Sequence, residues 1–211
     1  SHSGWGCGLE VGLVFPKAQR IAYLEWWFAD GAANLSFDPT NRWLRFDEGS
    51  MRKQRLRNLS LAYELTEAHQ VVAPTQWQRA QLPPLLQQIT SVIHEGVNTR
   101  EFLFNPRWRP KNRLRLTYAT RGMEPMRGFP ECMEAVAALL PRWPQLELVV
   151  AGEDRVCYGG ATPEQGSFGR WAKELLAPWA QQVRFVGRLD KPNYKRLLKS
   201  SHVHCYLTRP Y

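Results

Sequence analysis

The second half of the sequence alternates between short apolar runs and longer stretches with the spacing of an amphipathic helix. The apolar runs cover 113–120, 145–152, 182–189 and 202–207, and the helix-like stretches cover 128–143, 167–180 and 191–201. Such alternation predicts a parallel sheet with helices on both faces. The run "LELVVAG" fits a strand that is covered on both sides. The sequence therefore predicts an α/β fold for this half.

The first half shows a similar but less regular alternation. Strands are predicted at 20–31, 69–74 and 89–96, and helices at 51–68 and 75–82. The apolar face expected for the first helix consists of Leu56, Leu59, Ala62, Tyr63 and Leu65. Thr75 is expected to cap the second helix, which should end at Pro83-Pro84.

The segment between the halves, 101–113, has two prolines, three arginines and no periodicity, so it is predicted to be a linker. The whole chain of 211 residues has a formal net charge of +9. A basic protein suits anionic partners, which include nucleic acid, an anionic membrane face and phosphate-bearing small molecules. The four cysteines lack metal-site spacing and are interpreted as reduced core thiols of a cytosolic protein.

Two arginine–glycine pairs lie where a predicted strand gives way to a predicted helix, in "TRGMEPMRGFP". Ligands of open α/β sheets bind beyond the carboxyl ends of the strands. Arg121 and Arg127 could bind phosphate oxygens there, beside the positive end of the helix. Gly122 and Gly128 would let a ligand approach the backbone closely. The pattern indicates either a diphosphate site or two solvated surface arginines, and position and charge alone leave both open.

The sequence resembles the glycosyltransferases of family 4. In the second half the resemblance rests on "RGMEPMRGFP", "LELVVAGEDRVCYG" and "VRFVGRLDKPNYKRLLKSSHVHCYLT". In the first half it rests on "HSGWG", "AYLEWWF" with a later "DG", "FDP", "RNLSL" and "APTQWQRAQLP". The resemblance implies a GT-B fold, with two Rossmann-like domains, and transfer of a sugar from a nucleotide diphosphate sugar with retention of configuration. It implies no metal and no other cofactor, and often bacterial surface polysaccharide as the product.

The resemblance also implies the domain organisation. Residues 1–105 correspond to the later half of the acceptor-side domain, 106–112 to the interdomain linker, and 113–211 to the first half of the nucleotide-sugar domain. The family's two glutamates spaced eight positions apart would follow Tyr211. We therefore expect a fragment in which both domains are incomplete and which is inactive alone.

Site residues follow from matching the family's motifs to this sequence. Arg121 and Arg127 match the arginine and lysine that bind the donor diphosphate, and an arginine in the second place is a departure. Gly187, Arg188 and Leu189 match a loop that packs on the nucleobase, although a plain strand end would look the same. Candidates on the acceptor side are His2 and Glu25.

Glu25 interrupts an apolar run, "AYLEWWF", so a buried or cleft-facing carboxylate is expected. A buried carboxylate needs a partner, so Glu25 is either paired structurally or functional. The implied partners are a nucleotide-sugar donor and a glycan or lipid-linked acceptor, with the protein in the cytoplasm or at the inner face of the membrane. Two alternatives remain: a basic nucleotide- or nucleic-acid-binding module without transferase activity, and a scaffold with a degenerate site. No nucleic-acid-binding motif supports the former.

Overall fold

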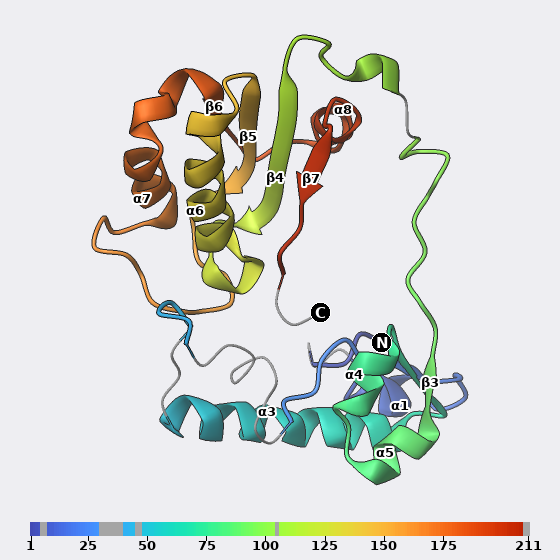
Figure 1. Ribbon diagram of the computed structural model, residues 1–211. Coiled ribbons are helices and arrows are strands. Elements are labelled where there is room, and N and C mark those ends of the chain that lie inside the picture. The colour runs from blue at the N-terminus through green and yellow to red at the C-terminus, as the bar shows by residue number, and fades with distance from the viewer. Residues whose placement is uncertain (5–7, 30–39, 45–47, 104–105, 209–211) are drawn as a thin grey trace. The chain divides into compact units, whose positions relative to one another are not determined.

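The computed structural model describes residues 1–4, 8–29, 40–44, 48–103 and 106–208 (Figure 1). The described residues form two compact units. The first unit holds the described residues up to 29 and those from 48 to 96, and the second holds 40–44 and 97–208. Part of the quoted motif "HSGWG", all of "FDP", Cys7 and the pair Asp30-Gly31 lie outside the described residues.

The first unit contains a parallel sheet with the strand order β1-β2-β3. The strands are β1 (Ile21–Tyr23), β2 (Gln70–Ala73) and β3 (Thr90–Val92). The helices are α1 (Val11–Val14), α3 (Glu48–Glu67), α4 (Gln76–Ala80) and α5 (Pro84–Ile89). Its core joins Ala22 and Leu24 to Leu61 and Leu65 of α3 and to Val71.

The predicted strand at 20–31 proves much shorter, because regular pairing with β2 ends at Tyr23 and only the amide of Leu24 continues it, donating to the carbonyl of Val72 (2.8 Å). The predicted apolar face of α3 is also largely wrong. Leu56, Leu59 and Tyr63 are exposed. Leu61 and Leu65, four residues apart, are the residues that turn inward. The helix has apolar side chains around much of its circumference, so spacing alone does not select the buried side.

The sequence misses α5, since Pro83-Pro84 was expected only to end the preceding helix. Pro84 instead begins the next one, where a missing N–H costs no helical hydrogen bond. The cap predicted for α4 is confirmed, because the Thr75 hydroxyl accepts a hydrogen bond from the amide of Gln78 (3.1 Å).

The second unit contains a four-stranded parallel sheet with the order β6-β5-β4-β7. The strands are β4 (Leu114–Gly122), β5 (Leu146–Glu153), β6 (Val183–Gly187) and β7 (Val203–Cys205). The helices are α6 (Phe129–Leu139), α7 (Phe168–Leu175) and α8 (Lys191–Lys199). Short 3-10 turns are η1 (Pro106–Trp108), η2 (Pro125–Arg127), η3 (Leu140–Arg142) and η4 (Ala177–Gln182). The predicted alternation of strands and helices is therefore confirmed.

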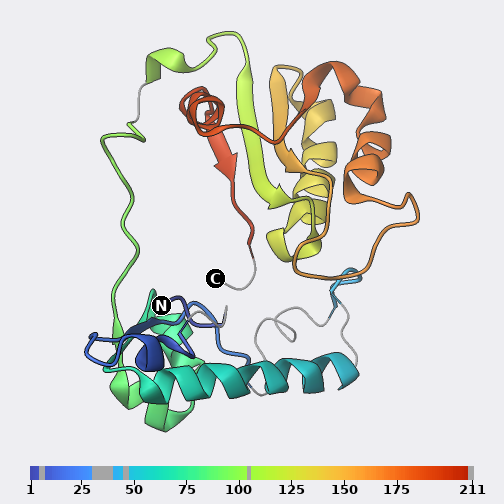
Figure 2. The same ribbon diagram turned by 180° about the vertical axis from the view of Figure 1, so that it is seen from behind.

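Helices cover both faces of this sheet, as the sequence predicted (Figure 1 and Figure 2). Leu148 and Val150 of β5 lie in a core shared with α6 and α7. The alternate residues Val149 and Ala151 pack with Leu197 of α8 on the other face. The period of two along β5 divides its side chains between the two layers.

The strand order creates a switch point. From β4 the chain moves outward through β5 to β6, and then returns to place β7 on the opposite side of β4. In open parallel sheets this reversal leaves a crevice beyond the carboxyl ends of the two diverging strands. The expected ligand site of the unit is thus the edge where β4 and β7 end.

Residues 40–44 come from the first half of the chain but pack in the second unit. The Trp43 ring meets Phe168 edge to face, with the ring centroids 5.2 Å apart. The carbonyl of Trp43 accepts a hydrogen bond from the amide of Ala161 (2.7 Å), and the Asn41 amide donates to the Glu131 carboxylate (2.6 Å). This segment closes the α6–α7 side of the core.

Candidate functional site

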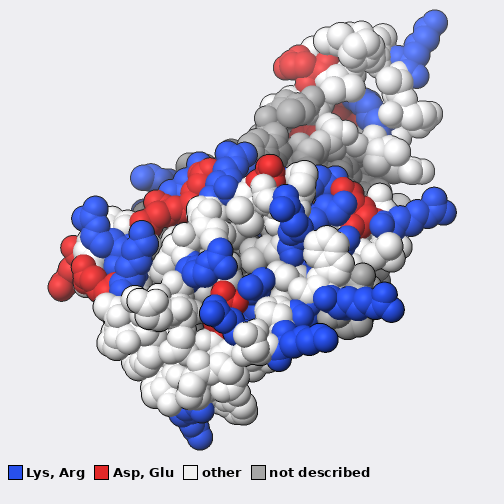
Figure 3. Space-filling view, turned by 90° about the horizontal axis from the view of Figure 1, so that it is seen from above, with Lys and Arg blue, Asp and Glu red and all other residues white. Residues whose placement is uncertain are grey.

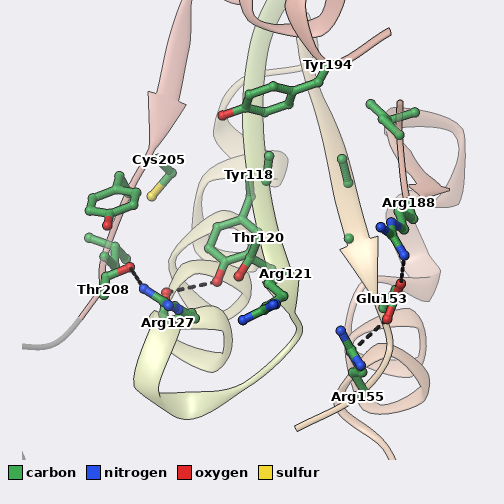
Figure 4. A pocket seen from close by; sticks show the side chains of 16 residues that line it. Tyr118, Thr120, Arg121, Arg127, Glu153, Arg155, Arg188, Tyr194, Cys205 and Thr208 are labelled. Atoms are coloured by element: carbon green, nitrogen blue, oxygen red, sulfur yellow. Dashed lines mark hydrogen bonds and ion pairs between the residues drawn. The ribbon is translucent and has the colours of Figure 1, made fainter. Parts of the chain in front are cut away.

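A pocket of about 510 Å3 opens at the switch point, beyond the carboxyl ends of the strands (Figure 4). Its volume lies within the usual range for small-molecule sites. All four strands of the sheet contribute to it, directly or through the residues that follow them. The lining residues are Tyr118–Arg121, Arg127, Ala151–Glu153, Arg155, Arg188, Leu189, Tyr194 and Cys205–Thr208.

Both arginines predicted to bind phosphate line this pocket. Arg121 lies near the end of β4, and Arg127 ends the 3-10 turn that leads into α6. The Arg127 guanidinium donates to the Thr208 hydroxyl (3.2 Å), and its main-chain carbonyl accepts from the Tyr118 hydroxyl (2.8 Å). Burial holds the pKa of Tyr118 above its usual range, so this phenol remains a neutral donor. Tyr118 therefore holds the main chain of Arg127, and Thr208 holds its guanidinium.

The two glycines have a different role from the one expected. Gly128 has φ +64° and ends the 3-10 turn in the left-handed region. A side chain there would meet the Cβ of Leu207 at 2.5 Å, and one at Gly122 would meet the carbonyl oxygen of Arg155 at 2.6 Å. Other segments of the chain, rather than a ligand, approach the two glycines closely, and neither glycine lines the pocket.

The predicted nucleobase loop is divided in the structure. Arg188 and Leu189 line the pocket, whereas Gly187 ends β6 with φ +69° and lies outside the lining. Arg188 donates to one oxygen of Glu153 (3.2 Å), and Arg155 donates to the other (2.7 Å). Figure 4 shows Glu153 between these two arginines.

Sequence reasoning missed Arg155 and Glu153. Both follow the apolar run at 145–152, so the rule that carboxyl ends of parallel strands share one edge could have found them. It also missed Cys205 and Thr208, at and beyond the end of β7, and the same signal marks them.

The thiols of Cys205 and Cys132 lie together at the pocket. Cys205 lines it, and Cys132 of α6 is buried beside it. A hydrogen bond from Cys132 lowers the pKa of Cys205 to about 7, against the opposing effect of burial. The same contact, with burial, raises the pKa of Cys132. Cys157 is exposed, so the cysteines described are not all core thiols as the sequence suggested.

His2 and Glu25, the acceptor-side candidates, meet in the first unit. The Nε2 atom of His2 lies 3.1 Å from the Glu25 carboxylate. Their side chains are 39% and 55% exposed, so of the two positions expected for Glu25 the buried one is wrong, and the cleft-facing one stays a prediction. β1 ends two residues earlier, which leaves Glu25 beyond the sheet. Nearby, the Tyr23 hydroxyl donates to Glu95 (2.5 Å) and the Tyr23 ring lies 5.5 Å from that of His2.

Two features are absent from the described part of the chain. No group of three or more His, Cys, Asp or Glu side chains within it suits a metal ion. None of its helices combines the length and apolar character needed to cross a bilayer.

Residues 1–102 match the model of a family described as "Glycosyl transferase family 4 group". This match covers 102 of the 211 residues. No curated protein sequence matches the chain.

Solved structures share the fold. WaaG, a glycosyltransferase involved in lipopolysaccharide biosynthesis, aligns with a TM-score of 0.60 and 14% identity over 95% of this chain. TarM aligns with a TM-score of 0.52 and 16% identity over 90% of this chain, and so does a mutant of S. aureus TarM in complex with Fondaparinux, alpha-GlcNAc-glycerol and UDP. The chain spans 56% of WaaG and 32% of TarM. The predicted fold class, α/β of GT-B type with Rossmann-like units and parallel sheets, is thereby confirmed.

Proposed function

We propose that the protein is a glycosyltransferase that moves a sugar from a nucleotide diphosphate sugar to an acceptor hydroxyl. The observation that carries this proposal is that Arg121 and Arg127 line one pocket at the switch point of the second unit. The family match over residues 1–102 and the shared fold support it. So does UDP, which is present in the structure of the TarM mutant.

In the proposed reaction the bond between the sugar's anomeric carbon and the diphosphate breaks, and the leaving diphosphate gains negative charge. Fixed cations that face this charge lower the barrier more than they favour the bound donor. Arg121 and Arg127 would supply them, and α6 begins two residues after Arg127, which adds the positive end of its dipole. We propose retention of configuration, with no metal and no other cofactor.

The remaining parts of the reaction are assigned to other residues. Arg188 and Leu189 are proposed to pack on the nucleobase, with Gly187 turning the chain before them. His2 and Glu25 are proposed to act on the acceptor side, where a carboxylate and an imidazole can bind or deprotonate a sugar hydroxyl. The acceptor would be a glycan or a lipid-linked glycan of the cell surface, reached from the cytoplasm at the inner face of the membrane.

Binding of nucleoside diphosphates to the 211-residue chain tests the proposal. Isothermal titration with UDP, GDP and ADP should give saturable binding of at least one of them at ordinary salt. Arg121→Ala should weaken that binding about tenfold or more, because a charge-assisted bond to phosphate is lost. Arg170→Ala, an exposed arginine of α7 away from the pocket, is the matched control and should bind like the wild type.

A parallel titration with DNA at several salt concentrations tests the nucleic-acid alternative. On the face in Figure 3, Lys and Arg side chains are scattered among uncharged residues and interspersed with Asp and Glu. A nucleic-acid surface would instead gather cations in one patch or stripe. DNA binding that falls steeply with salt, together with no affinity for any nucleoside diphosphate, would overturn the transferase in favour of that alternative.

A further inference from the structure

Tyr158, on the loop after β5, contacts two of the arginines that line the pocket, Arg121 and Arg127. The guanidinium of Arg121 lies 3.5 Å from the Tyr158 hydroxyl, at the outer limit of a hydrogen bond. The guanidinium carbon of Arg127 lies 4.8 Å from the centre of the Tyr158 ring, which is within the range of a cation–π contact. One side chain therefore touches the two cations in two different ways.

The position of Tyr158 is itself fixed by a buried carboxylate. Glu124 is fully buried, and its Oε2 atom accepts hydrogen bonds from the amides of Cys157 and Tyr158, both at 2.7 Å. The carbonyl of Glu124 accepts from the amide of Arg127 (3.2 Å). Glu124 thus ties the turn that carries Arg127 to the loop that carries Tyr158.

Tyr158 holds the arginines without occupying the space between them and a ligand. It is not one of the residues that line the pocket, whereas Arg121 and Arg127 both are. A tyrosine in this position restricts two long side chains before a ligand arrives.

We propose that Tyr158, presented by Glu124, is a positioning residue that sets the spacing of Arg121 and Arg127 for the two phosphates of a diphosphate. This inference rests on the proposed function. Without Tyr158, Arg121 would lose this hydrogen bond and Arg127 would lose its ring contact while keeping Thr208. More of their ordering would then occur when the diphosphate binds, at a cost in conformational entropy. A single phosphate needs only one arginine, so its binding should depend much less on their spacing.

Titration of the 211-residue chain with inorganic pyrophosphate, orthophosphate and UDP tests the inference. Tyr158→Phe removes only the hydroxyl contact and should weaken pyrophosphate and UDP about threefold, whereas Tyr158→Leu removes both contacts and should weaken them about tenfold. Orthophosphate affinity should change less than about twofold. Tyr63→Phe, an exposed tyrosine of α3, is the matched control.

A double-mutant cycle supplies a readout that a merely structural role would not give. In an Arg121→Ala background, Tyr158→Phe should have no further effect, because the hydroxyl acts only through Arg121. Additive losses, an equal loss of orthophosphate and pyrophosphate affinity, or wild-type affinity in Tyr158→Leu would each overturn the inference and leave the proposed function intact. If the wild-type chain binds neither pyrophosphate nor any of the nucleoside diphosphates UDP, GDP and ADP, the proposed function fails and the inference fails with it.

Discussion

Cys205 combines a place in the pocket with an acidic thiol. Its thiolate fraction at neutral pH depends on the hydrogen bond from Cys132, since burial alone would raise its pKa. The thiolate is the reactive form of cysteine. The rate at which the Cys205 thiol reacts should therefore depend on the contact between Cys132 of α6 and Cys205 of β7.

Alkylation of Cys205 by iodoacetamide should be half-maximal near pH 7, about 1.5 units below an ordinary thiol. Peptide mass spectrometry across pH 5–10 measures this profile. Cys132→Ala should move the midpoint upward because the donor is lost, while Cys132→Ser keeps a donor and should move it less. A wild-type midpoint near pH 8.5 would contradict the assignment.

Gly128, beside the site, places a strict demand on the backbone, since it has a left-handed φ and little room for a side chain. Gly128→Ala should lower the free energy of unfolding by about 1–3 kcal/mol, through a left-handed φ and a clash with Leu207. Gly166→Ala is the control, since φ there is +82° but a side chain would meet open space. Urea denaturation should rank Gly128→Ala as the more destabilising change, and the reverse order would refute the role of the Leu207 contact.

β5 illustrates how an element can contain a buried charge. Glu147 is 3% exposed and lies among the apolar residues of β5 that precede Gly152 and Glu153. The Nε atom of Arg115 on β4 lies 2.8 Å from its carboxylate, and Arg184 and Arg113 lie at 3.5 and 3.6 Å. Burial would raise the pKa of Glu147, but the hydrogen bond and charge of Arg115, with the charges of the other two arginines, outweigh burial and lower it.

Arg115→Leu should destabilise the second unit by about 3 kcal/mol, because a buried carboxylate loses its nearest partner. Arg184→Leu removes a more exposed and more distant partner and should cost less than about 1 kcal/mol. Chemical denaturation of both variants gives the comparison. Similar losses would show that Arg115 has no special part in neutralising Glu147.

The same carboxylate gives a pH dependence of known sign. Its folded-state pKa is lowered, so its contribution to stability is present above the unfolded pKa of about 4.3 and is lost as pH falls through the folded value. The stability difference between wild type and Glu147→Gln should therefore be constant near neutrality and shrink below about pH 4. Denaturation midpoints measured from pH 7 to pH 3 check this, and a difference that grows on acidification would contradict it.

Over the whole molecule, the two units have separate cores, and a short segment from the first half of the chain belongs to the second core. Trp43→Ala should destabilise that second core by about 3 kcal/mol, because its ring packs on Phe168 and Trp171. Hydrogen exchange should then accelerate in α6 and α7 while β1–β3 keep their protection. Loss of protection confined to β1–β3 would refute this assignment of residues 40–44.

Much of the second unit could be predicted because its signals are local. Apolar runs of strand length, helical spacing and the residues after each strand depend on neighbours a few positions apart, and strand polarity alone places Arg121, Arg188 and Leu189 at one edge. The first unit was predicted less well. Its strands are three or four residues long, and α3 has apolar residues on several sides.

The sequence thus established parallel sheets, helices on both faces and a cationic strand-to-helix corner, since each follows from residue type and period. Tertiary packing placed β7 against β4, which brought Thr208 to Arg127 and Cys205 to Cys132. It also joined Glu124 to the loop bearing Tyr158, and His2 to Glu25. These partners lie 23 to 81 positions apart. At such separations pairing depends on which elements pack together, and no local pattern encodes that choice.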